Sequence, residues 1–391
     1  MIQLNPDNLV RVELTPKEQK TVLNHCQSID RDIYDRIRNA PDGVLHLLIE
    51  DCHYLKGCIH LEMERNIIPE NQTILGKVFN KLSPNPITRD IAAEIEGLDF
   101  DDIDNLNDHL QGIMTGQNTT PDPEMGGLSP EQVARLIHVP WDDDNFPLKF
   151  NKQMTIDDLK NSPFFHNARS FLNTLIQMEK KNTATVKGNL TRIVVKAIFD
   201  QLIMPESDRN SILSYNKVIN ELDVKALHHI RVVCESAGII KLQKKHFIVE
   251  KDYIELLDDK NAGKLFYLLF FSYFRKFNIA YVDGMYDFDC IQDTIPYSFY
   301  RLSKIGKKQV DINKLKKLVF LPAVLEELID EYLPILDMID EITLLVQLRI
   351  VKPLESFGLI ECYCIKKYKC YREIDKVKKT ELFDKFMKFE V

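Results

Sequence analysis

Two nearly identical hexapeptides decide the fold that the sequence predicts: ESAGII, residues Glu235–Ile240, and ESFGLI, residues Glu355–Ile360. In each, a segment with helical spacing of apolar residues ends at a glycine, Gly238 or Gly358. Glycine most readily adopts the left-handed conformation found just past the end of a helix. The repetition therefore indicates that the chain turns the same corner twice, from a helix into a strand.

After each glycine the sequence has the pattern of a short β-hairpin. IIKLQKKHFIVEKD follows Gly238, and LIECYCIKKYKCYREID follows Gly358. A helix, a glycine stop and a two-stranded hairpin form the second half of a winged-helix unit, which is a variant of the helix-turn-helix. We therefore predict a mainly α fold with short β-hairpins and two tandem winged-helix-like modules in the C-terminal half. Pro353 lies in the second helix, which it is expected to kink or break.

The remaining sequence sets the predicted domain boundaries. An acidic stretch, DFDDIDNLNDH, and a loop-like stretch, TGQNTTPDPEMGG, separate the N-terminal part from the rest. The predicted segments are an N-terminal α/β segment (1–83), an acidic linker (84–127), a helical middle domain (128–182), a first winged-helix-like module (183–257), a helical connector (258–320) and a second module (321–391).

The charge is unevenly distributed along the chain. Residues 1–180 carry 17 Lys and Arg against 29 Asp and Glu, whereas residues 181–391 carry 34 against 30. Such a split is typical of a basic face for an anionic partner in the second half, but it can also reflect only separate solvated faces.

The cell compartment is predicted from what the sequence lacks. The start of the chain has no basic segment followed by an apolar one, so a secretory signal is not expected. The longest apolar run, Leu265–Phe274, is too short for a membrane span, which needs about 20 residues. Eight cysteines without a disulfide-like spacing suit a reducing compartment. We expect a cytoplasmic protein without a membrane partner.

Basic side chains in the C-terminal half are candidate nucleic-acid contacts, because Lys and Arg bind phosphates. Three lie in the first predicted hairpin, four in the second, and three in the stretch between the modules. The candidates are Lys241, Lys244, Lys245, Lys304, Lys307, Lys308, Lys366, Lys367, Lys369 and Arg372. The first presumed recognition helix offers Lys225, His228, His229 and Arg231, but no Asn or Gln, so base reading is weakly supported.

Other clusters of polar side chains carry weaker signals for chemistry. A possible polar site combines Trp141, Asp142, His166, Asn167 and Arg169, although solvated turns and satisfied backbone groups are the favoured explanation of these residues. Cys362, Cys364 and Cys370 lack the paired spacing of a zinc site, so we read them as strand residues and predict no metal. No nucleotide-binding or hydrolase motif is present, so we predict neither a cofactor nor catalytic residues.

Several short motifs occur in a fixed order between Gly127 and Lys241: SPEQ, a tryptophan–acidic loop, HNAR, GNL and a closing AGII. FRKFNIAY, which ends at Tyr281, follows them. In this order the motifs resemble an uncharacterised family of bacterial proteins. The resemblance implies no activity. It singles out six residues as fold or site elements: Trp141, His166, Asn167, Arg169, Gly188 and Asn189.

Three functions are consistent with these observations. The first is a non-enzymatic protein that binds DNA or RNA through its basic C-terminal half. The second is a protein-interaction or scaffold module without nucleic-acid contact, suggested by Pro353 and by the acidic first half. The third is an enzyme with a site near Trp141, His166 and Arg169.

Overall fold

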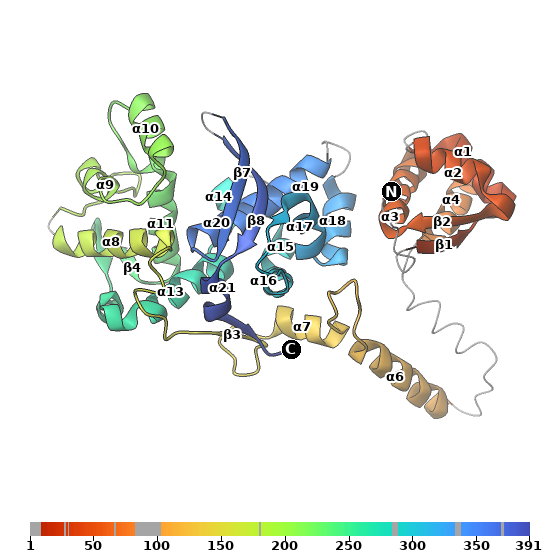
Figure 1. Cartoon of the computed structure of the whole chain (residues 1–391), viewed down its shortest axis with the longest axis horizontal. Coiled ribbons are helices and arrows are strands. Elements are labelled where there is room, and N and C mark those ends of the chain that lie inside the picture. The colour runs from red at the N-terminus through yellow and green to blue at the C-terminus, as the bar shows by residue number, and fades with distance from the viewer. Residues whose placement is uncertain are drawn as a thin grey trace. The chain divides into compact units, whose positions relative to one another are not determined.

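The computed structural model describes residues 9–26, 29, 31–65, 68–82, 103–179, 181–283, 288–332, 338–368 and 371–391. The described chain is mainly helical, with short antiparallel strand pairs (Figure 1). It divides into two compact units, one of residues 1–118 with 326–335 and the other of residues 119–325 with 336–391. Both glycine corners lie in the second unit.

The first unit contains one two-stranded sheet and several helices. β1 (Leu9–Glu13) pairs antiparallel with β2 (Val44–Leu48). Up to residue 82, its helical segments are α1 (Pro16–His25), α2 (Arg31–Asn39), η2 (Pro41–Gly43), α3 (Ile49–Arg65) and α4 (Pro69–Lys81). The Thr15 side chain and the Glu18 side chain cap α1 reciprocally, a capping box that fixes where this helix begins. Buried apolar side chains from both strands and all four helices form one core.

The segment predicted as an acidic linker contains a helix. α6 (Ile103–Thr119) occupies 17 residues of it. Residues 83–102, which hold much of the acidic stretch, lie outside the described residues. The described end of the predicted linker is therefore helical up to residue 119, and a turn at residues 122–128 follows.

The second unit begins with α7, whose first turn the side chains of Ser129 and Gln132 cap reciprocally. The elements up to the first hairpin follow in chain order. They are α7 (Pro130–His138), β3 (Leu148–Phe150), α8 (Pro163–Gln177), α9 (Arg192–Phe199), α10 (Glu206–Tyr215), η3 (Glu221–Asp223), α11 (Lys225–Ser236), β4 (Ile240–Gln243) and β5 (His246–Val249).

The first corner has the predicted geometry. Gly238 adopts φ +73° directly after α11, and its N–H donates to the carbonyl of Glu235. β4 and β5 then pair as an antiparallel hairpin. A third chain segment joins this hairpin, because Thr183 bridges antiparallel to His246 of β5. β5 is therefore the central strand, and α8 packs against β5, α9 and α11.

The remaining elements of the second unit lead to the second hairpin. They are α12 (Lys251–Ile254), η4 (Glu255–Leu257), η5 (Asp259–Asn261), α13 (Ala262–Phe271), η6 (Ser272–Lys276), α14 (Ala280–Asp283), α15 (Asp289–Asp293), α16 (Ile295–Ser303), β6 (Val310–Asp311), α17 (Ile312–Val319), α18 (Pro322–Tyr332), α19 (Met338–Val346), η7 (Gln347–Val351), α20 (Lys352–Ser356), β7 (Ile360–Tyr368), β8 (Tyr371–Lys379), α21 (Glu381–Phe386) and β9 (Met387–Phe389).

The second corner repeats the backbone pattern of the first. Gly358 adopts φ +77°, and its N–H donates to the carbonyl of Glu355. β7 and β8 form the long hairpin drawn in dark blue in Figure 1. The short strand β6 pairs with β8, which gives the sheet order β6-β8-β7. The returning strand of the hairpin is thus central here as well.

Helical structure continues through Pro353, so the expected break does not occur, although a π turn directly precedes the proline. The chain runs from α19 into the π-helical turn η7 and then into α20, with Pro353 in the first turn of α20. The N–H of Lys352 donates to the carbonyl of Gln347, five residues earlier. A proline in a regular helix clashes with the carbonyl four residues before it. The wider π turn directly before Pro353 changes this spacing, so helical structure resumes.

An aromatic core joins the two hairpin-bearing regions of the second unit. The rings of Phe266, Phe270 and Phe274, from α13 and η6, contact Phe357 just before the second glycine. Phe266 also contacts Phe165 of α8. The apolar run Leu265–Phe274 therefore lies mostly buried between the two regions. Among the described helices, none combines the length and apolar character that a bilayer crossing requires.

Candidate functional site

The tip of the first hairpin presents two exposed lysines. Lys244 and Lys245 form the two-residue turn between β4 and β5, with φ +49° and +65°. Neither makes an ion pair with another described residue. Lys241 differs, because its Nζ lies 2.5 Å from Oε1 of Glu250. Of the three lysines predicted to bind phosphate in this hairpin, the two at the tip carry uncompensated charge.

The basic residues of the second hairpin are only partly described. Lys366 and Lys367 lie on β7, and Arg372 lies opposite Lys367 on β8. Their side chains, and the whole of Lys369 and Cys370, lie outside the described part of the chain. The backbone register places the three described positions near the tip of a hairpin with nine-residue strands.

The basic stretch between the modules lies at the base of the second hairpin. Lys307 and Lys308 are exposed in the loop before β6, and Lys304 is exposed with its ammonium 4.8 Å from the centre of the Tyr300 ring. Lys307 lines a groove together with Lys378 and Lys379 of β8. The same groove is lined by several acidic side chains, so its charge is mixed.

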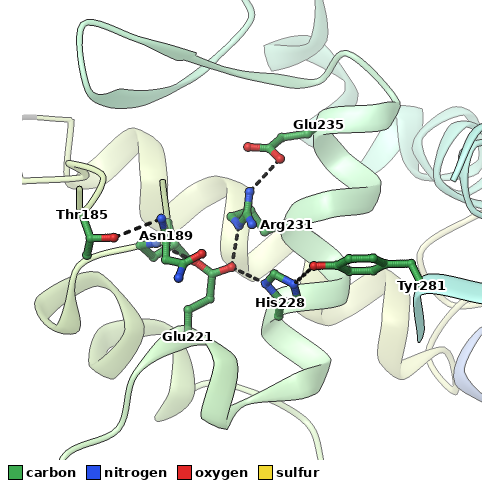
Figure 2. Close-up of polar contacts among 8 residues, drawn as sticks. Thr185, Asn189, Glu221, His228, Arg231, Glu235 and Tyr281 are labelled. Atoms are coloured by element: carbon green, nitrogen blue, oxygen red, sulfur yellow. Dashed lines mark hydrogen bonds and ion pairs between the residues drawn. The ribbon is translucent and has the colours of Figure 1, made fainter. Parts of the chain in front are cut away.

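On the presumed recognition helix α11, the side chains of His228 and Arg231 are not offered to solvent. His228 and Arg231 are each only 8% exposed, and both contact the fully enclosed carboxylate of Glu221 (Figure 2). Oε1 of Glu221 lies 2.6 Å from Nδ1 of His228 and accepts from Nε of Arg231 at 2.5 Å. Arg231 also donates to Glu235. These groups form a buried ion network, so they are not available to read bases.

The same carboxylate holds the loop that contains the GNL motif. Oε2 of Glu221 accepts from the backbone N–H of Leu190 at 2.5 Å. Before it, the N–H of Asn189 donates to Oγ1 of Thr185 at 3.1 Å, and Gly188 adopts φ +79°. The Gly188 and Asn189 positions that the resemblance singled out thus shape a turn that ends on Glu221.

The network reaches the surface at Tyr281. Nε2 of His228 lies 2.8 Å from the Tyr281 hydroxyl, and Tyr281 is 57% exposed (Figure 2). Tyr281 comes from α14, which is 45 residues after α11 ends. An exposed phenol, a buried imidazole and a buried carboxylate are therefore connected by consecutive short contacts.

Burial and charge set the protonation of the neighbouring groups. Burial acts to lower the pKa of Arg231, but the hydrogen bond and the charge of Glu221 outweigh it, so this pKa is raised. Burial lowers the pKa of His229 to about 4, and the charges of His228 and Lys225 act in the same direction. His229 is therefore neutral near pH 7, and α11 presents little positive charge beyond Lys225.

The polar site predicted around Trp141 separates into different structural roles. Trp141 is buried, and its ring stacks on Phe146 and Phe150. Its Nε1 has no hydrogen-bond partner among the described residues. Asp142 is exposed in the following loop. These contacts explain the tryptophan as part of the aromatic core.

Two residues of the HNAR motif, Asn167 and Arg169, form hydrogen bonds and an ion pair that connect α8 to neighbouring loops. The Asn167 side chain donates to the carbonyl of Ile203 and accepts from its N–H, at 2.9 and 2.7 Å. Arg169 donates twice to the carbonyl of Leu257 and forms an ion pair with Asp259. The His166 ring packs edge-on against Phe165. Asn167 and Arg169 thus satisfy backbone groups, one of the two alternatives that the sequence left open.

The described residues contain no group of three or more His, Cys, Asp and Glu side chains placed to hold a metal ion. Cys362 and Cys364 both lie on β7. Cys234, on α11, is fully buried, and burial raises the pKa of its thiol.

Sequence reasoning missed Glu221. It lies in a one-turn segment before α11, and its role depends on contacts that the fold creates. One signal was available: His228 and Arg231 are three residues apart on one face of an otherwise apolar helix, which calls for a buried acid to pair with them.

Comparison with known proteins gives one match. No curated protein and no solved structure matches the chain. The family model described as the Y4jL N-terminal domain, from a family of uncharacterised proteins, matches residues 160–262. This range runs from just before α8, through the first hairpin, to the first residue of α13, and it includes Glu221, His228 and Arg231. Over these residues, about a quarter of its length, the chain is similar to a Y4jL N-terminal domain.

Proposed function

We propose that the second unit contains two winged-helix-like modules, an internal repeat, and that the protein binds nucleic acid through their hairpins. The observation that carries this proposal is the strand order. In both regions the returning strand of the hairpin pairs with a short segment that precedes the helices, through a single bridge at Thr183 in the first region and through β6 in the second. A helix, a short strand, further helices and a hairpin with this pairing form a winged helix.

The positions of the basic residues support the proposal that the hairpins contact the phosphate backbone of a nucleic acid. In winged-helix proteins the wing touches the phosphate backbone while the second helix enters the major groove. Lys244 and Lys245 occupy the outermost turn of the first hairpin. Lys366, Lys367 and Arg372 occupy the corresponding part of the second. Because phosphate contacts release counterions, binding through these residues weakens steeply as salt rises.

The buried network on α11 argues against base reading by the first module. His228 and Arg231 are held by Glu221, and His229 is uncharged near pH 7. Lys225 is exposed on α11, and Ala226 beside it offers no polar group. Specific base contacts come mostly from Arg, Lys, Asn and Gln in the groove. We therefore propose binding that depends on backbone charge and shape rather than on sequence.

The test is a binding titration across a salt series. Fluorescence anisotropy of labelled duplex and single-stranded DNA and RNA is measured for the full chain and for the double variant Lys244→Glu/Lys245→Glu. We expect the plot of log affinity against log salt to become shallower in the variant, by about two units of slope, because two phosphate contacts are lost.

The matched control is Lys20→Glu/Lys77→Glu, which makes the same charge change on two exposed lysines of the first unit. It should leave the slope unchanged if the hairpin tip is the contact. If both double variants lost affinity equally, the loss would be explained by the change in net charge and not by contacts at the hairpin tip. Absence of salt-dependent association for the unaltered chain would remove the proposal.

A second candidate function, protein interaction, has its own observation. Large apolar side chains are exposed on the first hairpin-bearing region, between residues 186 and 222: Val186, Ile193, Leu213, Tyr215 and Leu222. A contiguous patch of such side chains would be typical of a protein-binding surface. Light scattering over a range of protein concentrations, with Ile193→Ser and Leu213→Ser as variants, tests for self-association. A monomer at every concentration, unchanged by the variants, excludes a homo-oligomer.

A further inference from the structure

The side chains of Tyr281, His228 and Glu221 form a line of contacts that leads from the surface to the interior at α11. The Tyr281 hydroxyl is at the exposed end, Nε2 of His228 lies 2.8 Å from it, and Oε1 of Glu221 lies 2.6 Å from the other ring nitrogen (Figure 2). His228 is 8% exposed and Glu221 1% exposed, whereas Tyr281 is 57% exposed. Of these three side chains, only that of Tyr281 is exposed to solvent.

The carboxylate fixes which imidazole nitrogen carries the proton. Glu221 also accepts from the Leu190 N–H and from Arg231, so its side chain is held in one position. A carboxylate at Nδ1 favours the tautomer with the proton on Nδ1. In that tautomer Nε2 has a free lone pair that can accept a hydrogen bond from the Tyr281 O–H.

We propose that Tyr281 is a nucleophile activated by His228 as general base, with Glu221 as a positioning residue. A hydroxyl within hydrogen-bond reach of a base, which a third group orients, is the arrangement that activates nucleophiles in acyl transfer. The chemical class of substrate is an activated carboxylic ester. The inference goes beyond nucleic-acid binding and does not depend on it, because it uses none of the hairpin lysines.

The reaction step balances without a cofactor. The phenolic oxygen of Tyr281 attacks the acyl carbon, and its proton passes to Nε2 of His228. The new C–O bond forms, the bond from the acyl carbon to the leaving alkoxide or phenoxide breaks, and the leaving group departs. His228 then returns its proton to the leaving group or to water. The product is an ester on Tyr281, and no group is oxidised or reduced.

The surroundings of Tyr281 keep its ring in position for this step. The Phe277 ring packs edge-on against the Tyr281 ring, with centroids 5.9 Å apart. The His228 ring lies 5.8 Å from it. A ring held between two neighbours directs its oxygen consistently toward Nε2, and a positioned base contributes roughly 10²–10⁴-fold to a proton transfer of this kind.

The experiment uses 4-nitrophenyl acetate as the acyl donor and the intact chain as the protein. Acetylation is measured tyrosine by tyrosine with peptide mass spectrometry. Tyr215 serves as the internal reference, since it is 79% exposed and has no polar partner among the described residues. We expect Tyr281 to be acetylated about tenfold faster than Tyr215, or more. Equal rates would overturn the proposal.

Two variants separate a general base from a structural support. His228→Ala should bring the ratio of the Tyr281 and Tyr215 rates near one, and added imidazole should restore it. Glu221→Gln should lower the ratio while Tyr215 stays unchanged. If His228→Ala does not fold, the rate ratio in the unaltered chain still decides. A ratio above about ten that survives His228→Ala in a folded protein would also overturn the assignment of the base.

Discussion

The two glycine corners have the same backbone but different surroundings. Gly238 and Gly358 have φ values of +73° and +77°, and each N–H donates to the carbonyl three residues earlier. A Cβ on Gly238 would meet only the Tyr253 hydroxyl, at 3.8 Å. A Cβ on Gly358 would lie 2.5 Å from the carbonyl oxygen of Asn161. The local pattern thus decides the turn, and the tertiary fold decides how much space the turn has.

The helices that lead into the corners are also supported differently. α11 is stabilised by a buried ion network centred on Glu221. The helix before Gly358 contains a π turn and packs through Phe357 on an aromatic core. One corner therefore depends on charge pairing and the other on close packing. Four sets of substitutions distinguish charge pairing from close packing as the source of stability at each corner. Trp141, the only tryptophan, lies in the second unit and reports its unfolding by fluorescence.

The largest effect is expected for Glu221→Gln. The change leaves the buried Arg231 and His228 without their carboxylate, and removing one partner of a buried ion pair costs about 3–5 kcal/mol. Urea unfolding followed by Trp141 fluorescence measures the loss. Glu235→Gln is the control, since Glu235 is about one third exposed and should lose less than about 1 kcal/mol. Equal losses would show that the first corner does not depend on the Glu221 charge.

The second effect compares the two glycines directly. Gly358→Ala should cost about 2–4 kcal/mol, because the left-handed conformation is unfavourable for alanine and the new methyl overlaps the Asn161 carbonyl. Gly238→Ala should cost only the conformational part, about 1 kcal/mol. The same urea titration measures both. A larger loss at Gly238 would contradict the difference in space between the corners.

The sequence predicted the corners well and their partners poorly. A glycine after a helical run, followed by an apolar pair, is a local signal, and local signals suffice to place a turn and a hairpin. Glu221 carries no such signal, because its partners are seven and ten residues away and only the fold brings them together. The Asn161 carbonyl that presses on Gly358 is nearly two hundred residues distant.

Pro353 shows the limit of a propensity rule. The rule that proline breaks a helix assumes regular four-residue spacing of backbone hydrogen bonds. The chain meets the proline with a five-residue turn instead, from Gln347 to Lys352.

A third, smaller effect is expected for Pro353→Ala. The π turn already accommodates the ring, so removing the ring relieves little strain, while alanine adds flexibility to the unfolded chain. We expect the free energy of unfolding to change by less than about 1 kcal/mol in either direction. Hydrogen exchange of residues 347–356 reports whether the turn persists. Stabilisation by several kcal/mol would mean that the proline strains the second helix after all.

The smallest effect concerns a surface ion pair beside the second corner. The hydrogen bond from Lys385, together with bonds from Thr155, lowers the pKa of Asp158 to about 2. The lowered value means that the stabilisation is complete above the usual pKa of 3.8 and disappears as the pH falls through about 2. Asp158→Asn should lower the stability at pH 7 by less than about 1 kcal/mol, since the pair is near the surface.

Melting temperatures at pH 7 and at pH values down to about 2 test this dependence. The difference between the unaltered chain and Asp158→Asn should shrink as the pH falls. Asp157→Asn is the matched control, because Asp157 is exposed and makes no ion pair with another described residue. A difference that stays constant over the pH range would exclude the ion pair as its source.

The left-handed backbone at the tip of the first hairpin affects which residues selection would favour there. Lys244 and Lys245 both occupy the left-handed region, where a side chain other than glycine costs about 1–2 kcal/mol. Asn-Gly is the pair that suits such a two-residue turn. Selection for heat resistance alone would therefore favour the replacement of Lys244 and Lys245 by Asn-Gly. The hairpin would keep its register and gain robustness, and the molecule would lose two charges at its outermost turn.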